Sequence, residues 1–123
     1  MNNESGRGHG NRMLKREDAG SVTVLTETGE SPLSDAAPLK ETCHALVEEG
    51  RNRIVLNLEN VSLVTSMYLG GLISVMKTLR DDGGALKLLH LQPAVSSVLH
   101  LTRLSRIIEI FNDRETALKS SPP

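Results

Sequence analysis

Residues 53–72, RIVLNLENVSLVTSMYLGGL, decide the fold because their hydrophobic pattern changes half-way along. Residues 54–58 are dense in branched apolar side chains, which is typical of a central strand covered on both faces. From residue 69 onward apolar side chains recur with helical spacing, at Leu69, Leu72, Ile73, Met76 and Leu79. The stretch predicts a buried strand followed by a helix, with two adjacent hydroxyls, Thr65 and Ser66, where the helix begins.

Upstream of this stretch the sequence predicts a hairpin and a helix. A short strand over 12–16, turn residues in EDAGS and a second strand over 21–28 form the hairpin. An apolar stripe at Leu39, Cys43, Leu46 and Val47 predicts a helix over 36–49. Ser34 or Asp35 can cap its start, and Gly50 can end it.

Downstream, strands and helices continue to alternate. We expect the helix from Ser66 to end near Asp82, before two glycines, and a strand to follow over 85–91. A helix opens at Pro93, a last strand covers 106–111, and Asn112 caps a closing helix with Glu115 at the capping-box position. The order ββαβαβαβα predicts an α/β fold, a mixed β-sheet of four to five strands with helices packed mainly on one side.

Length and composition favour one domain in a reducing compartment. The 123 residues divide into a polar tail over 1–11, expected to be disordered, a domain over 12–119 and a frayed end over 120–123. Fourteen basic and fifteen acidic residues include no basic block, so nucleic acid is not an expected partner. No apolar run approaches the roughly 18 residues of a membrane span. The single cysteine fits the cytoplasm, which we take as the expected location.

No set of side chains in the sequence predicts catalysis, a cofactor or a metal site. Cys43 lies on the apolar stripe and is expected to be buried and inert. The histidines, at positions 9, 44, 90 and 100, lack the spacing of metal ligands, and no phosphate-binding loop occurs. The glycines of LGGL, at 70 and 71, are interpreted as allowing close packing of the helix on the sheet.

From about residue 21 to 117 the sequence resembles the STAS domain family, in particular the bacterial anti-sigma-factor antagonists. The resemblance rests on RIVLNLENVSLVTSMYLGGL, on GE at 29 and 30, and on the ordered motifs from LRDDGGALKLL to DRETAL. It implies a sheet of four or five strands and, by alignment, a phosphorylatable serine at Ser66. The implied partner is an anti-sigma factor that is a serine kinase of the histidine-kinase-like ATPase type, with a phosphatase that resets the switch.

The site departs from the family pattern, and alternatives stay open. The family's DSSG reads TSMY here, so a carboxylate and a glycine are replaced by Thr65 and Tyr68. One alternative is that one of the two hydroxyls has no role besides capping the helix. Tyr68 can contact a partner beside the flexible Met67, or pack over the sheet edge. The expected partner-binding residues are Ser34, Thr65, Ser66, Met67 and Tyr68; the alternative function is a STAS module that serves as a structural subunit without phosphorylation.

Overall fold

Five strands form one sheet in the computed structural model, which describes residues 14–28 and 33–120. In chain order the elements are β1 (Leu14–Ala19), β2 (Val22–Glu27), α2 (Ala37–Glu48), β3 (Arg53–Asn57), α3 (Ser66–Asp81), β4 (Ala85–Leu89), α4 (Pro93–Leu101), the 3₁₀ turn η1 (Leu104–Arg106), β5 (Glu109–Phe111) and α5 (Arg114–Lys119). The predicted tail over 1–11, with His9, lies outside the described residues, as do Gly29, Glu30 and residues 121–123 of the predicted frayed end.

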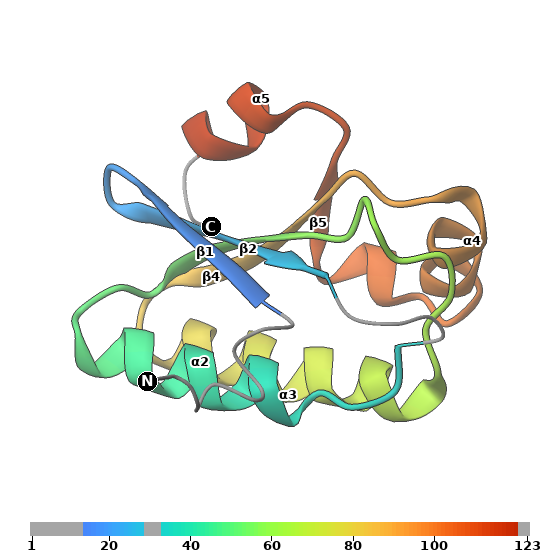
Figure 1. The fold of residues 1–123 in the computed structure, drawn as a ribbon, viewed down its shortest axis with the longest axis horizontal. Helices are drawn as coiled ribbons and strands as arrows, with labels where there is room; N and C mark the ends of the chain where they lie inside the picture. The colour runs from blue at the N-terminus through green and yellow to red at the C-terminus, as the bar shows by residue number, and fades with distance from the viewer. Residues whose placement is uncertain (1–13, 29–32, 121–123) are drawn as a thin grey trace, which may run out of the picture.

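The sheet order β1-β2-β3-β4-β5 explains where the helices lie. β1 pairs antiparallel with β2, and the other three pairings are parallel. Because crossovers between parallel strands share one hand, a sheet that grows in one direction places successive crossover helices on the same face. α2 and α3 lie side by side below the sheet in Figure 1, while α4 lies towards its end. The predicted mixed sheet with helices mainly on one side is confirmed.

The main core lies between the sheet and these helices. Its fully buried leucines come from the strands, from α2 and from α3: Leu25, Leu56, Leu88, Leu39, Leu46, Leu72 and Leu79. α3 also passes close to the start of α2, because a Cβ added at Gly71 would lie only 2.2 Å from that of Ala36. Gly71 therefore allows helix-to-helix packing, and the expected helix-to-sheet role is wrong. Gly70 meets nothing within 4 Å.

The opposite face of the sheet is covered by α5 (Figure 1). There Val24, Val55 and Leu89 pack with Ala117 in a smaller apolar cluster. An ion pair of 2.6 Å joins Arg114 of α5 to Glu17 of β1. The last helix is thus attached to the first strand.

The hairpin turns later than the sequence predicted. β1 continues to Ala19 through the residues expected to turn, and the chain reverses at Gly20 and Ser21. Gly20 has φ +64°, a left-handed conformation that suits a two-residue hairpin turn. Part of the predicted strand, residues 12 and 13, lies outside the described residues.

Two helix starts and two strand bounds also differ from the prediction. α2 has Ala36 at its N-cap position, although Asp35 Oδ1 does accept the N–H of Ala37 at 2.9 Å. α5 is capped by Asp113, whose side chain accepts the N–H of Thr116 at 2.9 Å, so the Asn112 cap is wrong by one residue. β4 ends at Leu89, before His90 at φ 57°, and η1 shortens β5 to three residues. Gly50, at φ +84°, does follow the end of α2 as predicted.

Within the described ranges, no helix combines the length and apolar character that crossing a bilayer requires.

Candidate partner-binding site at the start of α3

The two adjacent hydroxyls at the start of α3 have different environments. Thr65 is the N-cap residue: its backbone is extended, and its Oγ1 accepts the N–H of Tyr68 at 3.3 Å. Ser66 is the first helical residue, and its side chain is exposed. The capping role therefore belongs to Thr65, and the Ser66 hydroxyl is accessible to a partner.

The segment after β2 is tied to the start of α3 by backbone bonds. Leu33 donates to Leu63 O at 2.8 Å, and its carbonyl accepts the N–H of Thr65 at 3.0 Å. Leu33 and Val64 thereby form an isolated parallel bridge. Ser34 is half-buried and follows directly in the chain, so the structure brings it to the neighbourhood of the helix start.

Two apolar side chains are exposed beside Ser66. Met67 is 72% exposed, which fits the expected contact residue, and Leu63 is 44% exposed. Sequence reasoning missed Leu63, because nothing in the apolar run around it distinguishes this exposed leucine from the buried Val61 and Val64. An exposed hydroxyl flanked by two exposed apolar side chains is suited to contact with a protein surface.

Tyr68 is not a surface residue. Its side chain is fully buried, and its hydroxyl donates to Glu27 Oε2 at 2.6 Å. The expectation that Tyr68 contacts a partner is wrong for the described structure, because the ring points into the core from the first turn of α3. The alternative, that it packs over the sheet edge, agrees with its hydrogen bond to Glu27, the last residue of β2. Sequence reasoning also missed Glu27, whose place at the end of an alternating strand gave no sign of its burial.

Both members of the Glu27–Tyr68 pair have raised pKa values. Burial raises the pKa of Glu27 above its ordinary value, against the opposing effect of the Tyr68 hydrogen bond. Burial and the neighbouring Glu27 carboxylate raise the pKa of Tyr68 well above its ordinary value. The pair therefore joins β2 to α3 by a buried, charge-assisted hydrogen bond.

The electrostatic setting of Ser66 is that of an open helix N-terminus. The first turn of α3 contains no acidic side chain, so the positive end of the helix dipole is not neutralised from within that turn. Thr65 occupies the N–H of Tyr68, which leaves the preceding helical N–H groups without a bond to the described residues. This end of the helix can stabilise a negative charge on the Ser66 side chain.

The remaining candidates from the sequence lie on other elements than α3. Cys43 is buried, and burial raises the pKa of its thiol to about 12. His44 and His100 are exposed on α2 and α4, and His90 is half-buried after β4. In the described part of the chain, no three side chains of the metal-binding types come together.

The chain belongs to the STAS domain family, whose model matches residues 14–117. It is 32% identical over 99 residues to a Thermotoga maritima protein named "Putative anti-sigma factor antagonist", covering 80% of this chain and 88% of that protein. Among solved structures, an anti-sigma factor antagonist from Mycobacterium paratuberculosis gives a TM-score of 0.71 at 25% identity, covering 85% of this chain and 89% of the other.

The fold is shared with the anti-sigma factor antagonist SpoIIAA. Its unphosphorylated form gives a TM-score of 0.66 at 20% identity, covering 85% of this chain and 92% of that one. A structure of SpoIIAA from Bacillus in its phosphorylated form gives 0.63 at 18% identity, covering 85% and 96%.

Proposed function

We propose that this protein is an anti-sigma factor antagonist, acting in the cytoplasm, that binds a serine-kinase anti-sigma factor of the histidine-kinase-like ATPase type. Binding uses the start of α3 and the adjacent segment, with Ser34, Thr65 and Met67 at the contact and Ser66 as the phosphoacceptor. Antagonism of that partner would release a sigma factor and so regulate transcription. The observation that carries the proposal is the separation of roles between Thr65 as cap and Ser66 as exposed hydroxyl.

Phosphorylation at Ser66 would act on the interface more than on the fold. A phosphoserine adds about 1.5 to 2 negative charges. The helix N-terminus can stabilise this charge within the domain. A partner surface docked over Ser66, Met67 and Leu63 would instead meet a bulky dianion that must be desolvated. The unphosphorylated and phosphorylated forms of SpoIIAA support this proposal, since a protein of this fold exists in both states.

The first experiment measures binding of phosphomimetic variants to the anti-sigma factor. In calorimetry, Ser66→Asp should bind at least about tenfold more weakly than the parent. The introduced carboxylate would be buried in the interface without a partner, which costs more than about 1 kcal/mol. Ser74→Asp is the matched control, since Ser74 is exposed on the same helix two turns further along. Its affinity should equal that of the parent, and equal affinity for all three proteins would contradict the switch.

A second measurement tests the modification itself. After incubation with the kinase and ATP, intact mass should increase by one phosphate in the parent and in Ser74→Ala, and not in Ser66→Ala. Tight binding with no added mass would favour the alternative, a STAS module that binds as a structural subunit without a phosphorylation cycle.

A further inference from the structure

Among the described strands, β1 lies at one edge of the sheet. It pairs only with β2, and no strand in the described ranges lies on its other side. β1 is the foremost strand in Figure 1, so that view looks onto this edge. The outward N–H and C=O groups of an edge strand can pair with another extended chain.

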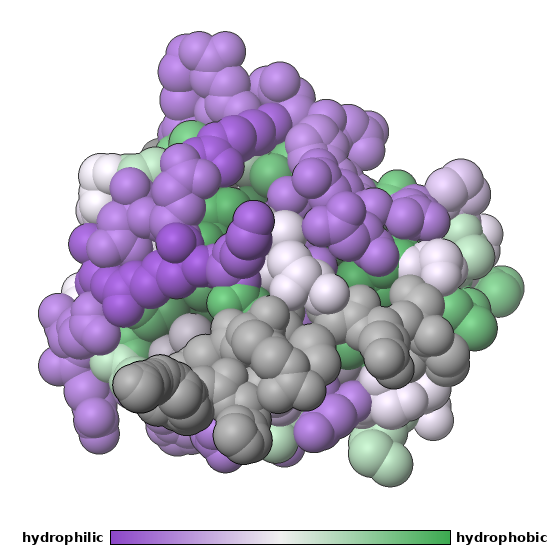
Figure 2. All heavy atoms as spheres, viewed as in Figure 1, coloured by the Kyte–Doolittle hydropathy of each residue, from purple (hydrophilic) through white to green (hydrophobic). Residues whose placement is uncertain are grey.

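Charged side chains alternate along β1 so that each face of the sheet carries both signs. On the face of α5, Lys15 precedes Glu17, which pairs with Arg114. On the face of α2, Arg16 precedes Asp18 and bonds both it and Glu49. Figure 2 shows hydrophilic residues over this strand, with hydrophobic residues visible beside them. Charged side chains on an edge strand usually prevent association. Here, however, a second copy of β1 laid antiparallel can place a positive residue of one strand opposite a negative residue of the other.

We propose that β1 pairs antiparallel with β1 of a second copy of this chain, which joins the two sheets into one. The two-fold axis of such a pair runs perpendicular to the sheet, so residues that face each other lie on the same face in both copies. With Arg16 on the axis, Lys15 of each copy lies opposite Glu17 of the other. Two cross-strand pairs of opposite charge result, and such pairs stabilise a ladder.

The existing contacts of Lys15 and Arg16 are compatible with this register. Lys15 is exposed and forms no ion pair with the described residues, so pairing across the axis sacrifices none of those contacts. Arg16 would face Arg16 of the second copy. Within its own chain, however, Asp18 at 3.0 Å and Glu49 at 2.9 Å already neutralise it and direct it towards α2. Repulsion between the two guanidinium groups is therefore reduced.

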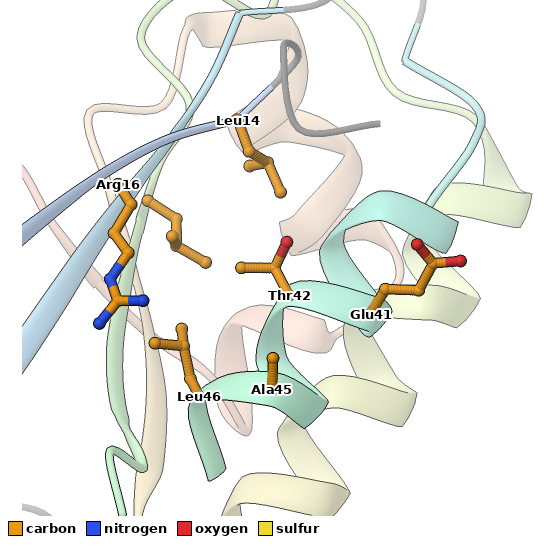
Figure 3. A pocket seen from close by; sticks show the side chains of 7 residues that line it. Leu14, Arg16, Glu41, Thr42, Ala45 and Leu46 are labelled. Carbon is orange, nitrogen blue, oxygen red and sulfur yellow. The ribbon is translucent and has the colours of Figure 1, made fainter. Parts of the chain in front are cut away.

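An apolar hollow lies under the same edge. It has a volume of about 450 Å³ between the hairpin and α2. Its lining is Leu14, Leu25, Ala45 and Leu46, with Arg16, Glu41 and Thr42 as polar members (Figure 3). Pairing through β1 would place the two hollows facing each other beneath the joined sheet, and the apolar lining of both would lose contact with water.

The test is a charge exchange in the full-length chain, measured by analytical ultracentrifugation. The parent should sediment as a dimer in equilibrium with the monomer. Lys15→Glu and Glu17→Lys should each raise the dimer dissociation constant by about tenfold or more, because each places like charges opposite one another twice. An equimolar mixture of the two variants should again form dimers, since both facing pairs of positions 15 and 17 are then of opposite charge.

Melting curves of the single variants, unchanged from the parent apart from the loss of a surface ion pair in Glu17→Lys, would show that both are folded. A monomeric parent, single variants that dimerise as tightly as the parent, or a mixture that stays monomeric would each overturn the proposal. A monomeric parent would also be the result if the edge serves a strand from another protein.

Discussion

At the scale of single residues, the pair of Tyr68 and Glu27 is what most distinguishes the interior of this protein. A carboxylate that is 3% exposed has its hydroxyl partner at 2.6 Å, in the first turn of the helix that presents Ser66. A buried carboxylate without a hydrogen-bond donor is costly, so each member of the pair depends on the other.

Tyr68→Phe should lower the free energy of unfolding by about 1–3 kcal/mol at pH 7. The variant keeps the aromatic ring but removes the hydroxyl that donates to the buried Glu27 carboxylate. Urea denaturation gives this value directly. The loss should be smaller at a pH where Glu27 is protonated in the folded state. A variant as stable as the parent at pH 7 would show that the hydrogen bond contributes nothing.

Glu27→Gln should change how stability depends on pH. Because burial raises the pKa of Glu27 above its ordinary value of 4.5, the folded state binds the proton more tightly than the unfolded state. The contribution of Glu27 to stability is therefore fully present below pH 4.5 and is lost as the pH rises through the folded-state pKa. The glutamine variant lacks this loss.

The measurement is the difference between the free energies of unfolding of Glu27→Gln and parent from pH 4 to 8. We expect this difference to move in favour of the variant as the pH rises. Asp18, Glu49 and Asp113 have lowered pKa values and the opposite pH dependence, but both proteins share them, so they cancel. A difference independent of pH would contradict the assignment.

At the scale of elements, α3 is the helix whose start carries the proposed binding site, and its first residues were also the best predicted. The spacing of apolar residues predicted β3 and α3 correctly from the sequence, and the two adjacent hydroxyls predicted a hydroxyl cap between them. The prediction was wrong where choices are nearly equal in energy. Asn112 and Asp113 are both good caps, and an edge hairpin can turn at any of several polar residues.

Thr65→Ala should destabilise the protein by about 1 kcal/mol, since it removes the cap of α3. Thr65→Ser and Thr65→Asp keep an acceptor at the cap position and should stay within about 0.5 kcal/mol of the parent. Thermal and urea unfolding of the three variants provide the check. If the alanine variant matches the serine variant, Thr65 is not the cap, and Ser66 is no longer free of that role.

At the scale of the whole molecule, alternation of strands and helices together with the STAS resemblance was enough to predict the architecture. The residue pattern could not reveal that Tyr68 turns inward or that Glu27 is buried with it. These two residues lie 41 positions apart and meet only through the register of β2 and the packing of α3. In such cases a contact residue that is distant in the sequence decides whether a side chain is buried, and the local sequence does not indicate that residue.

The position of α5 also has a consequence for how the protein is made. Val24, Val55 and Leu89 lie on the strands of the sheet, yet Ala117, which covers them, follows all three in the chain and is synthesised after them. While α5 is still inside the ribosomal exit tunnel, a nascent sheet would leave one apolar face exposed to other polypeptides. This face of the sheet is therefore covered only after α5 has been synthesised, and chains that stall before α5 would be the species that chaperones must hold.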